Sequence, residues 1–190
     1  MLPAIDLHSH TTASDGGLSP AELVAMAVAK GLQYLAITDH DTCAGLDEAR
    51  TAAQQTGLSV VAGIELSTTW ANCGIHVVGL GIDDKHPAMV EAETEQARAR
   101  ALRSVEIDQQ LQQRGMTGVM ARAREFASSD SLGRPHFARA MVELGYVDSE
   151  PEAFDRYLGS KRPGDDGESS WLDCRGGRDR GGGPSVEIRP

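Results

Sequence analysis

The stretch IDLHSHTTASD, residues 5–15, carries two histidines and an aspartate close together. In an H-x-H pair on an extended backbone, both side chains point to the same side, so the imidazoles of His8 and His10 can converge on one ion. Asp15 can add a carboxylate oxygen. This combination is typical of a divalent metal site, although a strand end that happens to carry two polar histidines gives the same residue pattern.

The same residue types recur downstream, after short apolar runs. The further candidates are Asp39, His40, Asp41, Glu65 and His76. His40 follows the run at residues 35–38, and Glu65 follows the run at residues 60–64. The carboxyl ends of parallel strands meet at one edge of a sheet, so we expect these side chains on the same face as the H-x-H pair. His76 fits less cleanly, because it lies near the start of its own predicted strand.

Strands and helices alternate over the first 82 residues. Ser19 is a good N-cap, and Glu22 completes a capping box at the start of a predicted helix that ends at Gly31. Residues 45–55 form the next predicted helix. Buried strands are predicted at 4–7, 35–38, 60–64 and 75–82. This alternation predicts parallel β-α units joined by right-handed crossovers.

From Pro87 onward the pattern is helical without strands, and it ends near Gly159. The predicted helices cover residues 88–113, 118–127, 134–145 and 149–159. Residues 160–190 are rich in Gly, Arg and Asp and offer no apolar face, so we expect them to be disordered. The predicted division is therefore a metal-binding part (1–86), a helical insert (87–159) and a tail (160–190).

The charge of the chain is unevenly distributed. Its net charge of −10 argues against a general nucleic-acid coat protein. Residues 1–97 hold 13 acidic and 3 basic side chains, whereas residues 98–139 hold 4 acidic and 8 basic ones. This arginine-rich segment suits an anionic substrate, although it also fits a solvated helix face. No apolar run approaches the ~18 residues that span a bilayer, so we expect no membrane insertion and a cytoplasmic location.

Read in order, the motifs DLHSH, TDHD, GIEL and IHVVGLGID resemble the PHP (polymerase and histidinol phosphatase) family, and GRPHFAR and YLG agree with it. The likeness covers about residues 4 to 159. Within the family it is strongest to enzymes that act on nucleotide 3',5'-bisphosphates and as 5'-to-3' exoribonucleases on short RNA. It implies an α/β fold: the N-terminal part of a distorted (β/α)7 barrel with a helical insert, incomplete in this chain.

The resemblance also implies a cluster of up to three divalent ions. The implied ligands are His8, His10, Asp15, His40, Glu65 and His76, and Glu65 is expected to bridge two ions. Mixed imidazole and carboxylate ligands fit Mn²⁺, Zn²⁺ or Fe²⁺, and we expect Mn²⁺. Asp39 and Asp41 are expected to orient His40 from behind or to cap the next helix, with capping favoured for Asp41.

The implied activity is metal-dependent hydrolysis of phosphate esters by an activated water. Arg134 and His136 are expected to contact the substrate phosphate or base, although His136 also fits a polar helix start. The expected partner is a phosphorylated small molecule, nucleotide or short RNA, and no stable protein partner is predicted. The alternatives are a histidinol-phosphate-type phosphatase and a catalytically inactive metal-binding module, like the PHP domains attached to some DNA polymerases.

One departure from the family concerns the second half of the barrel. The family supplies three further ligands from later strands, a His before Pro at an apolar strand end and an Asp-x-His pair near the C-terminus, and this sequence has neither motif in those places. The family pattern stops after Tyr157-Leu158-Gly159, where the composition changes. A truncated or frame-altered reading of a longer protein is the simplest hypothesis. We therefore expect low stability and weak or absent catalysis for the 190-residue chain.

Overall fold

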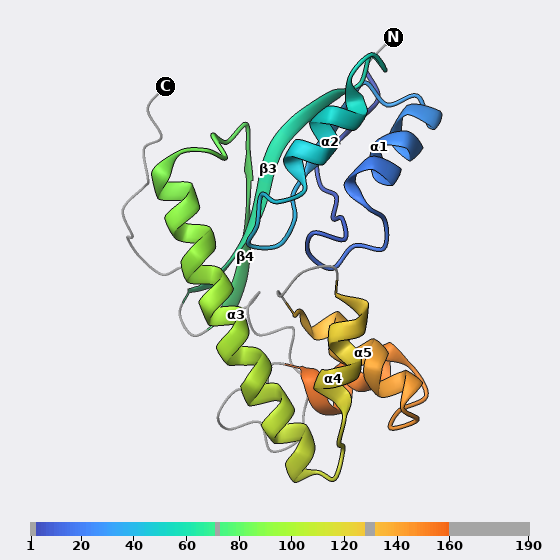
Figure 1. The fold of residues 1–190 in the computed structure, drawn as a ribbon, viewed down its shortest axis with the longest axis vertical. Helices are drawn as coiled ribbons and strands as arrows, with labels where there is room; N and C mark the ends of the chain where they lie inside the picture. Colours follow the sequence, from blue (N-terminus) through green and yellow to red (C-terminus); the bar gives the residue numbers. More distant parts are fainter. Residues whose placement is uncertain (1–2, 71–72, 128–131, 160–190) are drawn as a thin grey trace, which may run out of the picture. The chain divides into compact units, whose positions relative to one another are not determined.

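The structure is a computed structural model that describes residues 3–70, 73–127 and 132–159 (Figure 1). All of these residues belong to one compact unit, residues 1–159. The predicted tail, residues 160–190, lies outside the described residues. The strands are β1 (Ile5–Asp6), β2 (Tyr34–Ile37), β3 (Ser59–Trp70) and β4 (Cys73–Leu80). The helices are α1 (Pro20–Ala29), α2 (Leu46–Ala53), α3 (Pro87–Gln113), α4 (Val119–Phe126), α5 (Arg134–Glu143) and α6 (Glu150–Ala153), followed by the π-helical turn η1 (Phe154–Leu158).

The described strands form a sheet in the order β1-β2-β3-β4, in which β1, β2 and the first part of β3 are parallel. Helices α1 and α2 connect these parallel strands and pack together (Figure 1). The predicted capping box is confirmed at the start of α1: the Ser19 hydroxyl accepts from the Glu22 amide at 3.2 Å, and the Glu22 carboxylate accepts from the Ser19 amide at 2.8 Å. Val24, Leu35 and Leu46 are buried in the core beneath these helices.

Three expectations about the strands are wrong. Strand β3 does not end at Glu65; it continues to Trp70 and pairs with β4 in an antiparallel manner, because only two residues separate Trp70 from Cys73, too few for the crossover that a parallel pair needs. Glu65 therefore lies inside a strand. The first strand is not buried either: Ile5 and Leu7 are 48% and 44% exposed, because β1 is a two-residue edge strand that pairs only with β2 in the described sheet.

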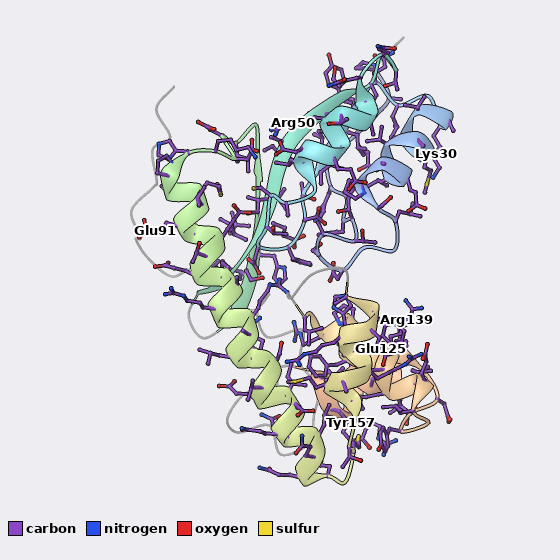
Figure 2. The ribbon with its side chains drawn as sticks, in the orientation of Figure 1. Lys30, Arg50, Glu91, Glu125, Arg139 and Tyr157 are labelled. Carbon is purple, nitrogen blue, oxygen red and sulfur yellow. The ribbon has the colours of Figure 1, made fainter. Side chains whose placement is uncertain are left out.

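The helical segment has a second core of its own. Val119, Phe137, Ala138 and Met141 are fully buried there, and the side chains of α6 and η1 close the cluster. Helix α3 contributes Leu111 to this core but is otherwise largely exposed, as Figure 2 shows for Glu91 near its start. The predicted boundary between residues 86 and 87 coincides with the start of α3 and stays a prediction as a domain division. In the described residues no helix combines the length and apolarity needed to cross a membrane.

Candidate metal centre

The backbone brings the two histidines of the first loop against the end of β2. Ser9, which separates them, donates its amide to the Thr38 hydroxyl at 3.0 Å and accepts from the Thr38 amide at 2.8 Å. Its own hydroxyl donates to the carbonyl of Ala36 at 2.6 Å. The imidazoles of His8 and His10 then converge, with their Nε2 atoms 3.1 Å apart. The predicted convergence of an H-x-H pair on an extended backbone is therefore present.

Glu65 lies at the centre of the cluster, with its side chain 9% exposed. Its Oε2 atom is 2.7 Å from His8 Nε2, 3.1 Å from His10 Nε2 and 3.9 Å from His40 Nδ1. Its Oε1 atom is 2.8 Å from His76 Nδ1. His76 thus joins the site through β4, although strand ends alone did not place it there. One carboxylate faces four imidazoles, an arrangement suited to bridging cations.

Asp15 forms the second anionic position. Its Oδ1 atom is 3.9 Å from His10 Nδ1, and its Oδ2 atom is 3.8 Å from His40 Nε2. The Nδ1 atoms of His10 and His40 are buried and have no hydrogen-bond partner among the described residues. A buried imidazole nitrogen that faces a carboxylate from this distance fits an ion between the two.

The six predicted ligands offer three overlapping groups whose ligand atoms lie within 4.8 Å of one another. These groups are His8, His10 and Glu65; His10, Asp15 and His40; and His40, Glu65 and His76. The residues present therefore fit up to three divalent ions, and metal ligation itself stays a prediction. The cluster is open to solvent at His8 and His76, whose side chains are 52% and 41% exposed, and closed at Glu65, whose side chain is 9% exposed.

The protonation states favour cation binding. Burial lowers the pKa of the His40 imidazole more than the nearby Asp15 and Glu65 carboxylates raise it, so its ring is neutral near pH 7. Burial raises the pKa of the Glu65 carboxyl, but the His8 hydrogen bond and the surrounding imidazoles lower it further, so the net shift is downward. The site therefore presents a neutral His40 ring and an ionised Glu65 carboxylate, the forms that bind metals.

Asp39 supports the loop that carries two of the ligands. Its Oδ1 atom accepts from the Thr11 amide and the Ser14 hydroxyl, both at 2.6 Å, and its Oδ2 atom accepts from the Thr11 hydroxyl at 2.7 Å. These contacts fix the chain between His10 and Asp15. The expectation that Asp39 orients His40 is therefore corrected, because its hydrogen bonds run to the first loop.

Asp41 follows His40 and is 4% exposed. Its Oδ1 atom accepts from the Ser67 amide at 2.6 Å, and its Oδ2 atom accepts from Arg100 Nε at 2.6 Å. The favoured capping role is wrong, since the N-cap of α2 is Gly45, which makes no side-chain cap bond. Sequence reasoning also missed Arg100, and no local pattern distinguishes it from the other arginines of α3.

The two predicted substrate residues lie at the start of α5. His136 is 8% exposed, and its Nδ1 atom accepts from the Gly133 amide at 2.9 Å. Burial lowers the pKa of His136, and the negative charge of Asp15 partly opposes this effect. Burial and the charges of Arg103 and Arg100 lower the pKa of Arg134, which remains cationic. Arg134 therefore adds a positive charge at the start of α5, and the contact of both residues with substrate stays a prediction.

The family model of the PHP domain matches residues 6–142 of this chain. The chain belongs to the PHP domain family. The predicted resemblance to the PHP family is thereby confirmed. The predicted α/β fold class, an incomplete PHP barrel, is confirmed as well. The matched region of this PHP domain contains all six candidate ligands together with Arg134 and His136.

Curated relatives of this PHP domain include two kinds of enzyme. A 5'-3' exoribonuclease of Haemophilus influenzae is 45% identical over 159 residues, which cover 84% of this chain and 58% of the relative. A 3',5'-nucleoside bisphosphate phosphatase of Chromobacterium violaceum is 36% identical over 161 residues, covering 84% of this chain and 56% of the relative. The chain thus spans a little over half the length of these relatives.

Two solved structures share the fold. An amidohydrolase of Chromobacterium violaceum, with bound sulfate and no metal, superimposes with a TM-score of 0.79 at 35% identity, covering 86% of this chain and 58% of the other. A protein of Bifidobacterium adolescentis described as a metal-dependent phosphoesterase gives a TM-score of 0.74 at 30% identity, covering 85% of this chain and 57% of the other. One of these two solved relatives is thus described as a metal-dependent phosphoesterase.

Proposed function

We propose that this chain carries the metal-binding half of a phosphoesterase that hydrolyses phosphate esters of nucleotides or short RNA. The observation that carries the proposal is the position of Glu65, whose two oxygens face four imidazoles and which belongs to two of the three possible ion sites. The names of the relatives support the substrate class, because they act on RNA or on a nucleoside bisphosphate. Mn²⁺ is the proposed metal, with Zn²⁺ and Fe²⁺ as alternatives that the same ligands can bind.

The residues of the chain would divide the work in a simple way. Glu65 and Asp15 would supply the carboxylates that hold cations, and the four imidazoles would complete the ligand sets. Divalent ions bound here would polarise phosphoryl oxygens and lower the pKa of an attacking water. The open side of the cluster, beside His8 and His76, admits the phosphate. Arg134 and His136 would hold a second phosphate or the base, because guanidinium groups bind phosphate oxygens in pairs.

Metal content and phosphate release together test this proposal. The purified chain is stripped with a chelator, titrated with Mn²⁺, Zn²⁺ or Fe²⁺, and its bound metal is measured by elemental analysis. Inorganic phosphate is then measured with adenosine 3',5'-bisphosphate, a 5'-phosphorylated oligoribonucleotide and histidinol phosphate. We expect bound metal and weak release from the first substrate, the oligoribonucleotide or both, and both properties should fall in His8→Ala.

The matched control is His86→Ala, since His86 is an exposed histidine at the start of α3, away from the ligand set. It should bind metal and release phosphate like the parent chain. Bound metal without any phosphate release would favour a metal-binding module and overturn the hydrolase proposal. Release from histidinol phosphate alone would overturn the nucleotide assignment, and equal metal binding by His8→Ala would overturn the centre.

A further inference from the structure

Arg100 makes a buried ion pair that joins α3 to the candidate metal centre. Its Nε and Nη2 atoms both lie 2.6 Å from Asp41 Oδ2, and Nη2 also lies 3.4 Å from the Ser67 hydroxyl. The side chains of Arg100 and Asp41 are 11% and 1% exposed. Charge-assisted hydrogen bonds of this length in a buried setting are much stronger than surface pairs, so this contact holds its two elements together.

Asp41 is in an unusual backbone conformation. Its φ angle is +57°, in the left-handed region that residues other than glycine rarely adopt. Two groups hold it there besides Arg100: the Ser67 amide donates to its carboxylate, and its own amide donates to the Glu65 carbonyl at 3.0 Å. The surrounding contacts, and not the local preference of an aspartate, therefore maintain this conformation.

The strained residue adjoins two predicted metal ligands. His40 immediately precedes Asp41 and pairs with Glu65 in an isolated parallel bridge. Ser67, two residues beyond Glu65 on β3, is held by Asp41 from one side, and its carbonyl accepts from Gln96 of α3 at 2.8 Å. Because Asp41 directly follows His40, these contacts fix the backbone direction from which the His40 side chain projects.

We infer that Arg100 is a positioning residue for the metal centre: it holds Asp41 in the left-handed conformation and thereby sets the direction of His40. The inference rests on the proposed metal centre and adds to it a residue from the helical segment. His40 belongs to two of the three possible ion groups, whereas the group of His8, His10 and Glu65 does not contain it. Loss of Arg100 therefore weakens two ion sites and spares the third.

Titration of the chelator-treated full chain with Mn²⁺ tests the inference in Arg100→Met and Arg100→Lys. Outer contacts of metal ligands typically contribute about 10- to 100-fold to affinity, so we expect two of the three ions to bind at least about 10-fold more weakly in Arg100→Met. Arg100→Lys keeps the charge but not the paired donors, and a smaller loss at the same two sites is expected. Arg98→Met, an exposed arginine of the same helix, should titrate like the parent chain.

The outcomes distinguish a failure of the positioning role of Arg100 from a failure of the proposed metal centre. If the parent chain binds no Mn²⁺, the proposed function fails. If the parent binds Mn²⁺ and folded Arg100→Met binds all three ions unchanged, or loses all three equally, the positioning role is refuted. Far-UV circular dichroism verifies folding, and if Arg100→Met does not fold, the same selective loss is required of Arg100→Lys.

Discussion

The sharpest perturbation of the candidate centre compares its two carboxylates. Glu65 takes part in two of the three possible ion groups, whereas Asp15 takes part in one. Glu65→Gln and Asp15→Asn each replace one anionic oxygen by an amide without changing the size of the side chain. The structure therefore predicts an unequal loss of metal: Glu65→Gln should weaken two ions, and Asp15→Asn should weaken one.

The magnitude follows from the number of groups affected. Loss of an outer contact of a metal ligand costs about 10- to 100-fold in affinity, so loss of a ligand itself should cost at least about 100-fold. That factor corresponds to about 2.7 kcal/mol for each ion affected. For Glu65→Gln the total loss of binding free energy over two ions should therefore be about twice that of Asp15→Asn.

Equilibrium titration with Mn²⁺, followed by elemental analysis after gel filtration, measures both the number of ions and their affinities. The control is Glu91→Gln, an exposed glutamate on α3 that is labelled in Figure 2. It should retain every ion that the parent chain binds. Equal losses in Glu65→Gln and Asp15→Asn, or full occupancy in Glu65→Gln, would show that Glu65 is not the shared ligand.

Three further predictions concern stability and the shape of the site. The hydrogen bonds from Arg50 lower the pKa of the Asp84 carboxyl from its ordinary 3.8 to about 2. A carboxyl whose pKa is lower in the folded state stabilises the fold at pH values above its unfolded pKa, and this stabilisation is lost as the pH falls through its folded pKa. Asp84→Asn should therefore lower the free energy of unfolding in urea by about 2 kcal/mol at pH 7. The difference in unfolding free energy between the parent chain and the variant should shrink between pH 4 and pH 2. Phe137→Ala should cost about 3 to 5 kcal/mol in the same assay, because the ring is completely buried in the helical core, and a loss below 1 kcal/mol would contradict that packing. Gly16→Ala should weaken Mn²⁺ binding without removing a ligand, since the added Cβ would lie 2.3 Å from the His10 carbonyl oxygen; unchanged affinity would show that the loop can move aside.

Much of the candidate site could be predicted because its signals are local. His8 and His10 are two residues apart on an extended backbone, and their convergence needs only the alternation of a strand. The capping box of Ser19 and Glu22 depends on residues three apart and was found where it was expected. Glu65 was assigned to the same cluster from its place after an apolar run, although the strand continues beyond it.

Features that depend on distant partners could not be predicted in this way. The residues Ile5 and Leu7 are apolar and suggested a buried strand, but their exposure depends on which strands lie beside them in the sheet. The antiparallel pairing of β3 and β4 likewise depends on how the two strands lie beside each other and not on the composition of either strand. His76 was left unexplained by strand ends, and this pairing is what brings it to Glu65.

The amino-acid sequence by itself determined which side chains can bind divalent cations and that they follow successive apolar runs, because ligand chemistry and short-range periodicity belong to the residues. Only the tertiary structure decided that one carboxylate lies among four imidazoles and that Arg100 reaches Asp41, 59 positions away in the chain. The physical reason is that contacts between distant segments depend on how helices and strands pack. An arginine on an exposed helix therefore gives no sign in the sequence of the buried partner that it meets.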